Sequence, residues 1–135
     1  MTSYMAMFTS SVLLPFYLYH HDGDGEGRAY ILLERLKIGH LADSYPSELS
    51  GGELRRALIA RALINSPEII IADEPTSDLD INSAREVMEI FSQINSEGVA
   101  VLMVSHDLDS LRYGKRVLTM SEGILTEGTG NFTVK

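Results

Sequence analysis

The sequence contains no cysteine and no tryptophan, and only four of its 135 residues are proline. The lack of cysteine excludes disulfide bonds and thiolate metal sites, and it suits a cytosolic protein. No apolar run reaches the roughly 18 residues that a membrane-spanning helix needs. The most apolar stretch near the start, residues 12–19, is short, contains Pro15 and has no basic residue before it. We therefore expect no signal peptide and predict that this stretch is buried or faces a partner.

Basic residues are also scarce: 11 Lys and Arg stand against 19 Asp and Glu, which gives a net charge of −8. A field of that sign repels nucleic acid and free nucleotide, so no nucleic-acid partner is expected. Any phosphate site must be local and is expected to include a cation. The length fits one domain, and 44% hydrophobic residues suffice for a core.

Helical patterns alternate with short apolar runs along the chain. Residues 21–27 predict a loop, and residues 28–40 predict a helix that stops at Gly39. Residues 53–66 predict a second helix that ends before Pro67. The near-helical spacing in the first of these helices involves Ile31, Leu32, Leu36 and Ile38.

Two continuous apolar runs, residues 69–72 and 99–104, predict strands buried on both faces. Residues 83–95 predict a helix between them, with Val87, Ile90, Phe91 and Ile94 on one face. Residues 107–114 predict a short helix after the second run. Residues 116–128 predict a strand, a turn at Glu122-Gly123 and a return strand. The alternation of strand and helix predicts an α/β fold with a mainly parallel sheet.

The stretch "IIIADEPTSDLD", residues 69–80, ends an apolar run in acidic residues. Asp73, at the carboxyl end of its strand, would face the crevice where ligands bind and could hold Mg²⁺. Glu74 could orient or deprotonate a water molecule. A solvated acidic pair is the ordinary alternative, but four acids at one tip, with Asp78 and Asp80, would repel each other without a cation.

Two further patterns could handle phosphate. Ser50, Gly51 and Gly52 open a helix, whose first turn presents unpaired N–H groups; an ordinary Ser cap is the alternative. His106 ends the second apolar strand, where a lone histidine is more often structural than catalytic. The remaining histidines have no partner pattern and are predicted to lie on the surface: His20, His21 and His40.

Taken together and in this order, "LSGGE" (49–53), "IIIADE" with "PTSDLD" (69–80) and "VSHD" (104–107) resemble the second half of an ABC-type ATPase domain. The closest branch is that of transporter subunits of the lipoprotein-release and macrolide-export type. The resemblance runs from about Val12 to Gly123. It implies a single partial ABC ATPase domain, with the helical subdomain and signature helix at about 12–65 and the Walker B to switch-histidine core at 66–130.

The resemblance also implies ATP and Mg²⁺ as cofactors and assigns roles to the residues. Asp73 would serve the metal, Glu74 would be the catalytic base, and His106 would contact the γ-phosphate. Asp80 would make a contact across the dimer interface. The signature residues would serve the nucleotide bound to the opposite subunit: Ser50, Gly51, Gly52 and Glu53, the last standing where the family usually has Gln.

A phosphate loop of the form G-x-x-x-x-G-K-[S/T] does not occur in the sequence. Its only Gly-Lys pair, Gly114-Lys115, is followed by Arg116 and has Asp109 where the first glycine should be. The resemblance therefore implies a partial P-loop NTPase fold that lacks the phosphate-loop half and is inactive alone. The intact domain would couple ATP hydrolysis to transport, with a permease and a second ATPase subunit, at the cytoplasmic face of the cell membrane.

Two alternatives stay open. The chain could be a non-enzymatic interaction module that kept the fold. It could also be part of a DNA-repair or chromosome-maintenance ABC ATPase, although "PTS" after Glu74, the lack of heptads and the acidic charge argue against that.

In ATPases of this type the phosphate-loop strand lies between the strand that ends at His106 and the strand near 116–120. Without it, the apolar strand 99–104 would have a bare edge, and such edges recruit partners. Either the 116–120 strand pairs directly with 99–104, or a second copy covers the edge. We expect self-association.

Overall fold

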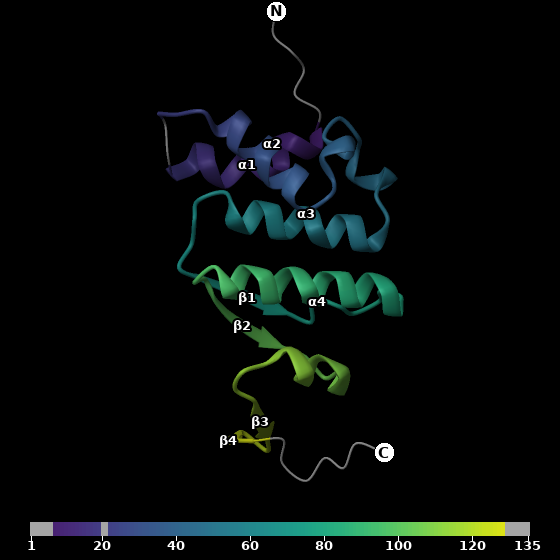
Figure 1. Cartoon of the computed structure of the whole chain (residues 1–135), viewed down its shortest axis with the longest axis vertical. Helices are drawn as coiled ribbons and strands as arrows, with labels where there is room; N and C mark the ends of the chain where they lie inside the picture. The colour runs from purple at the N-terminus through teal and green to yellow at the C-terminus, as the bar shows by residue number, and fades with distance from the viewer. Residues whose placement is uncertain (1–6, 20–21, 129–135) are drawn as a thin grey trace, which may run out of the picture.

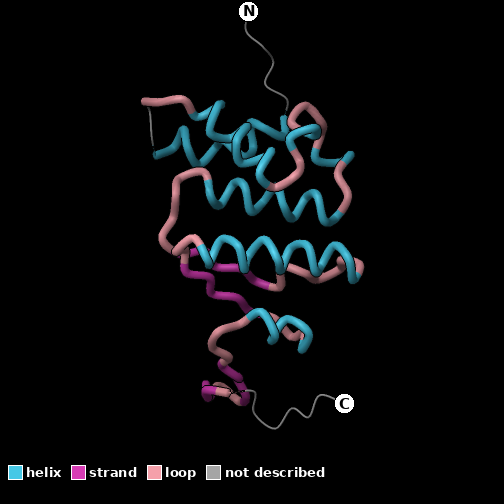
Figure 2. Tube along the Cα trace, in the orientation of Figure 1, coloured by secondary structure: helices cyan, strands magenta, loops and turns pink. Residues whose placement is uncertain are grey.

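The computed structural model describes residues 7–19 and 22–128. Three helices form a layer at one end of the molecule, a fourth helix lies beside two parallel strands in the middle, and a β-hairpin lies at the other end (Figure 1). The chain runs through these levels in sequence order (Figure 2). Among the described residues, no helix has the length and apolar character needed to cross a bilayer.

The first helix, α1 (Met7–Tyr19), is apolar around most of its circumference. Val12, Leu13 and Phe16 are buried, whereas Leu18 is 65% exposed. The apolar stretch 12–19 is thus buried on one face, as predicted, and exposed on the other. Asn65 ties α1 to the loop after α3, because its Nδ2 donates to the Pro15 carbonyl at 3.1 Å.

The second helix, α2 (Gly25–Arg35), begins inside the predicted loop 21–27. The reason is an N-cap: the Asp24 carboxylate accepts a hydrogen bond from the Gly27 N–H at 2.8 Å. The helix ends four residues before Gly39, because Lys37 adopts a positive φ of 60°. Ile31 is 69% exposed, so its prediction as part of the apolar face is wrong, and Leu33 is buried instead.

The third helix, α3 (Gly51–Leu63), follows two short 3-10 turns, Gly39–Leu41 and Pro46–Glu48. Its buried residues contribute to the continuous core, which also takes in residues of α1, α2, α4 and β1. The buried residues of α3 are Gly52, Ala57, Ile59, Ala60 and Leu63.

The strands β1 (Ile69–Asp73) and β2 (Ala100–Val104) pair in parallel, with Ile69 level with Ala100 and Asp73 level with Val104. The helix α4 (Ile81–Ser96) connects them and packs through the predicted apolar face, in which Val87, Phe91 and Ile94 are buried and Ile90 is partly buried. The α/β class with a parallel sheet is confirmed.

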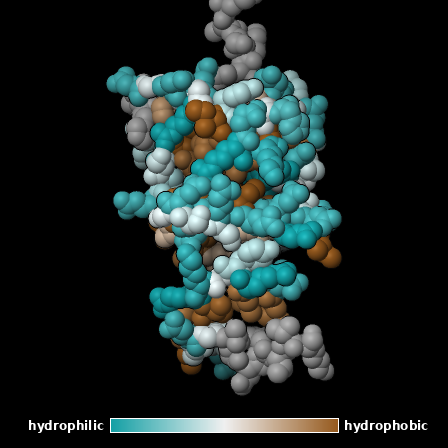
Figure 3. All heavy atoms as spheres, in the orientation of Figure 1, coloured by the Kyte–Doolittle hydropathy of each residue, from teal (hydrophilic) through white to brown (hydrophobic). Residues whose placement is uncertain are grey.

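The prediction that both strands are buried on both faces is wrong. Exposed side chains alternate with covered ones along β1, and no residue of β2 is fully buried. The open face consists of side chains that are 50–70% exposed: Ile69, Ile71, Leu102 and Val104. Only one face of this sheet is covered by the described helices, so half of the apolar pattern meets solvent. Apolar atoms accordingly reach the surface toward the strand-bearing end of the molecule (Figure 3).

The predicted hairpin is confirmed as β3 (Leu118–Ser121) and β4 (Ile124–Glu127), an antiparallel pair. Its turn has positive φ at Glu122 (50°) and Gly123 (79°), as a tight hairpin turn requires. The hairpin forms a separate two-stranded sheet, so β3 does not pair with β2. The segment Leu108–Tyr113 before it is a 3-10 helix.

We predict that Leu13→Ala destabilises the fold by about 2–5 kcal/mol, because Leu13 is fully buried in the helical layer. Leu18→Ala is the matched control in the same helix and should change stability by less than about 1 kcal/mol, since Leu18 is mostly exposed. Urea unfolding followed by circular dichroism measures both. Equal losses would mean that α1 does not pack as described.

Candidate functional site

The predicted signature segment forms the start of α3. Ser50 is the N-cap, and its Oγ accepts a hydrogen bond from the Glu53 N–H at 3.3 Å. Glu53 reaches back and accepts from the Ser50 N–H at 2.8 Å. This reciprocal capping box satisfies donors that a helix start otherwise leaves open. The hydrogen bonds from Ser50, first the backbone and then the side chain, lower the pKa of Glu53.

The two glycines of this segment lie against the segment that starts α4. A Cβ on Gly52 would lie 3.1 Å from Cβ and Oγ of Ser83, and a Cβ on Gly51 would lie 3.0 Å from Leu79 Cδ2. These glycines therefore have a packing reason besides the phosphate binding that the sequence pattern suggested. They set how near the signature helix comes to α4.

The turn after β1 connects these parts. The Arg55 guanidinium of α3 donates to Ser77 Oγ at 3.1 Å, and Ser77 Oγ donates to the Glu74 carbonyl at 3.0 Å. A chain of polar contacts thus runs from the signature helix to the residue that follows Asp73.

Asp80 is the N-cap of α4 and is exposed to solvent. Its carboxylate accepts from the N–H groups of Asn82 and Ser83 at 3.0 Å and from Ser83 Oγ at 2.6 Å. The hydrogen bonds from Ser83, the side chain first, lower the pKa of Asp80. Asp80 therefore stays ionised and has a structural role in addition to any contact across an interface.

Asp73 and Glu74 follow the carboxyl end of β1. Asp73 is exposed and level with Val104 of β2. The Glu74 N–H donates to the Val104 carbonyl at 2.8 Å, which continues the parallel ladder by one residue. Glu74 has a positive φ of 47°, an uncommon conformation for a residue with a side chain.

Glu74 and His106 meet at the ends of the two adjacent strands. Glu74 Oε1 lies 2.7 Å from His106 Nδ1 and accepts the His106 backbone N–H at 3.1 Å. Because a carboxylate only accepts, Nδ1 must carry the proton of the shared hydrogen bond. Both residues were predicted to lie at strand ends, but their contact was not predicted; the parallel order of the two strands was the signal for it.

The hydrogen bond and the charge of Glu74 raise the pKa of His106, and Asp107 adds to the effect. The imidazole is otherwise exposed. With Nδ1 occupied, Nε2 becomes a donor only when the ring is protonated. The raised pKa therefore favours the form in which His106 presents an outward N–H.

The predicted site residues form two groups. Glu74 and His106 meet directly, and Ser50 to Glu53 lie beside the start of α4, where Asp80 is the cap. The predicted convergence of four acids is not seen: within residues 7–19 and 22–128 no three metal-ligating side chains cluster. Asp78 lies in the turn after β1 with a positive φ of 62°, and the Asp80 carboxylate is engaged as the cap of α4. His40 is exposed as predicted, and His20 and His21 lie outside the described residues.

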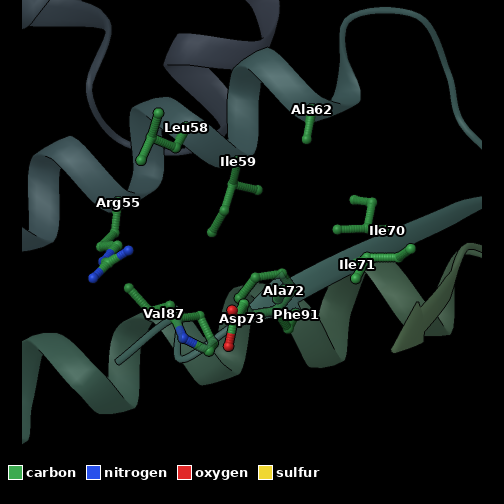
Figure 4. Close-up of a pocket in the computed structure, with 11 residues that line it drawn as sticks. Arg55, Leu58, Ile59, Ala62, Ile70, Ile71, Ala72, Asp73, Val87 and Phe91 are labelled. Carbon is green, nitrogen blue, oxygen red and sulfur yellow. The ribbon is translucent and has the colours of Figure 1, made fainter. Parts of the chain in front are cut away.

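A hollow of about 180 Å³ lies between α3 and β1. Figure 4 shows its apolar lining, with Arg55 at one side and Asp73 near the strand end. Leu58 of α3 and Ile71 of β1 contribute to the walls. The lining suits apolar side chains, so this hollow is not a phosphate site.

The class of the protein is an α/β core of the P-loop NTPase type. Its defining features are two parallel strands followed by acidic residues and a histidine, the helix that connects them, and the capped, glycine-containing helix α3. The model of the family described as "ABC transporter" matches residues 4–77, more than half of the chain. The chain therefore belongs to the ABC transporter family and corresponds to part of its ATP-binding cassette.

Similar proteins agree with this assignment. The macrolide export ATP-binding/permease protein MacB of Syntrophobacter fumaroxidans is 40% identical over 110 residues, which cover 81% of this chain and 15% of that protein. An uncharacterized ABC transporter ATP-binding protein of Methanocaldococcus jannaschii is 41% identical over 100 residues, which cover 74% of this chain and 45% of that protein.

Two solved cassettes have the same architecture. One is a dimeric cassette in a post-hydrolysis state with ADP and Pi, at a TM-score of 0.76 and 31% identity over 90% of this chain. The other is a cassette in its ADP conformation, at a TM-score of 0.78 and 27% identity over 92% of this chain. The chain spans 56% and 55% of these cassettes, that is, about half of their length.

We predict that Glu74→Gln lowers the pKa of His106 toward the ordinary value of 6.5, because it removes the negative charge of the carboxylate and leaves only a neutral amide oxygen to accept the hydrogen bond. Asp78→Asn is the control, since Asp78 belongs to the same turn and makes no described contact with His106. A titration of the imidazole protons by NMR measures both variants.

The pair also links protonation to stability. A raised folded-state pKa means that the contribution of the pair is fully present below about pH 6.5 and is lost as pH rises through the folded pKa. The opposite pH trend, or an unchanged His106 pKa in Glu74→Gln, would contradict the described contact.

Proposed function

We propose that the chain is the signature-to-switch part of an ATP-hydrolysing cassette, in an ABC transporter of the macrolide-export or lipoprotein-release type. The observation that carries this proposal is the contact of Glu74 with His106 at adjacent strand ends. In a cassette, Glu74 would hold the attacking water and His106 would face the terminal phosphate. The contact between Glu74 and His106 is compatible with both of these proposed roles.

The chemistry of the pair supports these roles. Among the described residues, no hydrogen bond engages Glu74 Oε2, which leaves this oxygen for a water molecule. Protonated His106 would donate from Nε2 to a phosphate oxygen while Nδ1–H holds Glu74 in place. A positioned base of this kind contributes roughly 10²–10⁴ in rate.

The residues present fit only part of an MgATP site. Asp73, exposed at the strand end, offers one carboxylate, and the described residues contain no larger group of metal ligands. When bound, Mg²⁺ would neutralise phosphate charge, and its remaining ligands would come from nucleotide, water or residues outside this sequence. The phosphate loop is likewise absent from the 135 residues.

Ser50 to Glu53 would serve a nucleotide held mainly by a second ATPase subunit, with Asp80 at the interface between the two. The solved dimeric cassette supports a paired arrangement. The name of the MacB relatives joins an ATP-binding part to a permease. We therefore propose a membrane permease as the other partner, which would hold the cassette at the cytoplasmic face of the membrane.

We predict that the 135-residue chain alone binds MgATP with a Kd above about 1 mM, since the signature loop and His106 offer only a few hydrogen bonds. Isothermal titration calorimetry measures the affinity. Binding in the micromolar range would mean that the chain carries a nucleotide site of its own.

The test of the proposed function is reconstitution. The chain is mixed with a separately produced cassette segment that carries a phosphate loop, and ATP hydrolysis is measured. We predict that activity appears in the mixture and that Glu74→Gln removes most of it, while nucleotide-driven association survives.

Asp78→Asn is the matched control and should retain most of the activity. A Glu74→Gln mixture that turns over at the unmutated rate would exclude Glu74 as the base. A mixture that associates but never hydrolyses ATP would favour a non-enzymatic interaction module.

A further inference from the structure

The left-handed conformation of Glu74 has to be held in place by its surroundings. A φ of 47° is strained for a residue with a side chain and persists only where neighbouring groups fix it. Pro75 follows, and a proline pushes the residue before it toward an extended backbone, which this φ does not allow. The conformation sets the direction of the carboxylate, which accepts two hydrogen bonds from His106. The groups that hold the Glu74 backbone therefore determine where its carboxylate lies.

Hydrogen bonds hold the backbone of Glu74 on both sides of its Cα atom. On the amino side, the Glu74 N–H donates to the Val104 carbonyl at 2.8 Å. On the carboxyl side, the Glu74 carbonyl accepts from the Ser77 N–H at 3.2 Å and from Ser77 Oγ at 3.0 Å. The strand ladder thus fixes one side of this residue, and Ser77 fixes the other.

Ser77 is held in turn by Arg55 of the signature helix, whose side chain extends from α3 toward the layer of β1 and α4 (Figure 4). Arg55 Nη2 donates to Ser77 Oγ at 3.1 Å and to the Ser77 carbonyl at 3.5 Å. A guanidinium only donates and a hydroxyl has one proton, so Ser77 Oγ accepts from Arg55 and directs its proton to the Glu74 carbonyl. The charge of Arg55 also strengthens this short chain of hydrogen bonds.

The partners of Arg55 distinguish it from the arginine beside it. Arg56 lies 4.0 Å from the Glu86 carboxylate and donates to the Leu36 carbonyl at 3.4 Å, so it ties α3 to α4 and to the end of α2. Arg55 is also partly buried, but it forms no ion pair with any residue of the described ranges. Its hydrogen bonds go to the two oxygen atoms of Ser77. The contact with this turn is therefore the interaction that orders the Arg55 side chain.

We propose that Arg55 is a positioning residue for Glu74: through Ser77, it holds the strained backbone that directs the Glu74 carboxylate toward His106. The proposal rests on the proposed function, in which Glu74 is the base. Arg55 acts through the turn, because its hydrogen bonds end on Ser77. Its removal would leave every reacting group in the chain and would release the base from its position.

The experiment is an NMR titration of His106 in the 135-residue chain without nucleotide. The hydrogen bond and the charge of Glu74 raise the pKa of His106, so this pKa reports where the carboxylate lies. Arg55→Met removes the contact with Ser77 and keeps a long side chain that favours helix. Loss of a positive charge would by itself raise the pKa of His106, whereas displacement of Glu74 lowers it. We expect a decrease of at least about half of that in Glu74→Gln.

Arg61→Met is the matched control, because it removes the same charge from the same helix and Arg61 has no hydrogen bond or ion pair within the described part of the chain. It should not lower the pKa of His106. Ser77→Ala should lower this pKa as Arg55→Met does, and the double variant should lower it no further, because both changes break one chain of contacts. Circular dichroism verifies that each variant is folded. An equal decrease in Arg61→Met, or additive decreases in the double variant, would overturn the proposal.

The reconstituted mixture tests the consequence for the reaction. Arg55→Met should lower kcat roughly ten- to hundredfold and change the KM for ATP by less than about twofold, since it displaces the base and removes no nucleotide contact. Arg55→Lys keeps the charge and a donor and should retain more activity than Arg55→Met. An unmodified mixture that does not hydrolyse ATP would contradict the proposed function. A His106 pKa that does not fall in Arg55→Met, or an unchanged kcat in that variant, would instead overturn the positioning role.

Discussion

The parallel pairing of β1 with β2 is the constraint on which the rest of the structure depends. It sets Asp73 level with Val104, and the Glu74 N–H extends the ladder by one more hydrogen bond. Only this register brings the side chains of Glu74 and His106 within hydrogen-bond distance, although 31 residues of crossover lie between them. The chemistry of the site is therefore a consequence of backbone alignment, with α4 holding the two strands in place from one side.

A second set of contacts joins the signature helix to this core. The missing Cβ atoms of Gly51 and Gly52 allow α3 to approach Leu79 and Ser83, and Arg55 fixes the turn through Ser77. The start of α3 and the start of α4 are thus held as one unit. A ligand that displaced the start of α3 would therefore also displace the start of α4.

The sequence was most informative where a local pattern determines the structure. The helix start at Ser50, the hairpin turn at Glu122-Gly123 and the apolar stripe of α4 depend on neighbouring residues and agree with their predictions. Asp73, Glu74 and His106 were correctly predicted to lie at strand ends, because the end of an apolar run indicates the end of a strand. The start of α2 was missed because Asp24 caps a helix that glycines open, which weakens the helical pattern.

The failures concern long-range packing. Ile71 and Leu102 belong to runs typical of strands covered on both faces, yet the described residues cover only one. An apolar sequence pattern indicates that its residues are suited to burial, but it does not show which helix or strand buries them. The contact between Glu74 and His106 was missed for a related reason, since strand order and register are needed to derive it.

The left-handed backbone of Glu74 has a consequence for how this position can change. At a φ of 47°, glycine or asparagine would have less backbone strain, and a residue with a longer side chain costs roughly 1–2 kcal/mol there. Either replacement would relax the backbone and remove the carboxylate that holds His106. Backbone strain and the contact with His106 therefore have opposite effects on stability at this residue. A replacement that relieved the strain would also give up the two hydrogen bonds to His106.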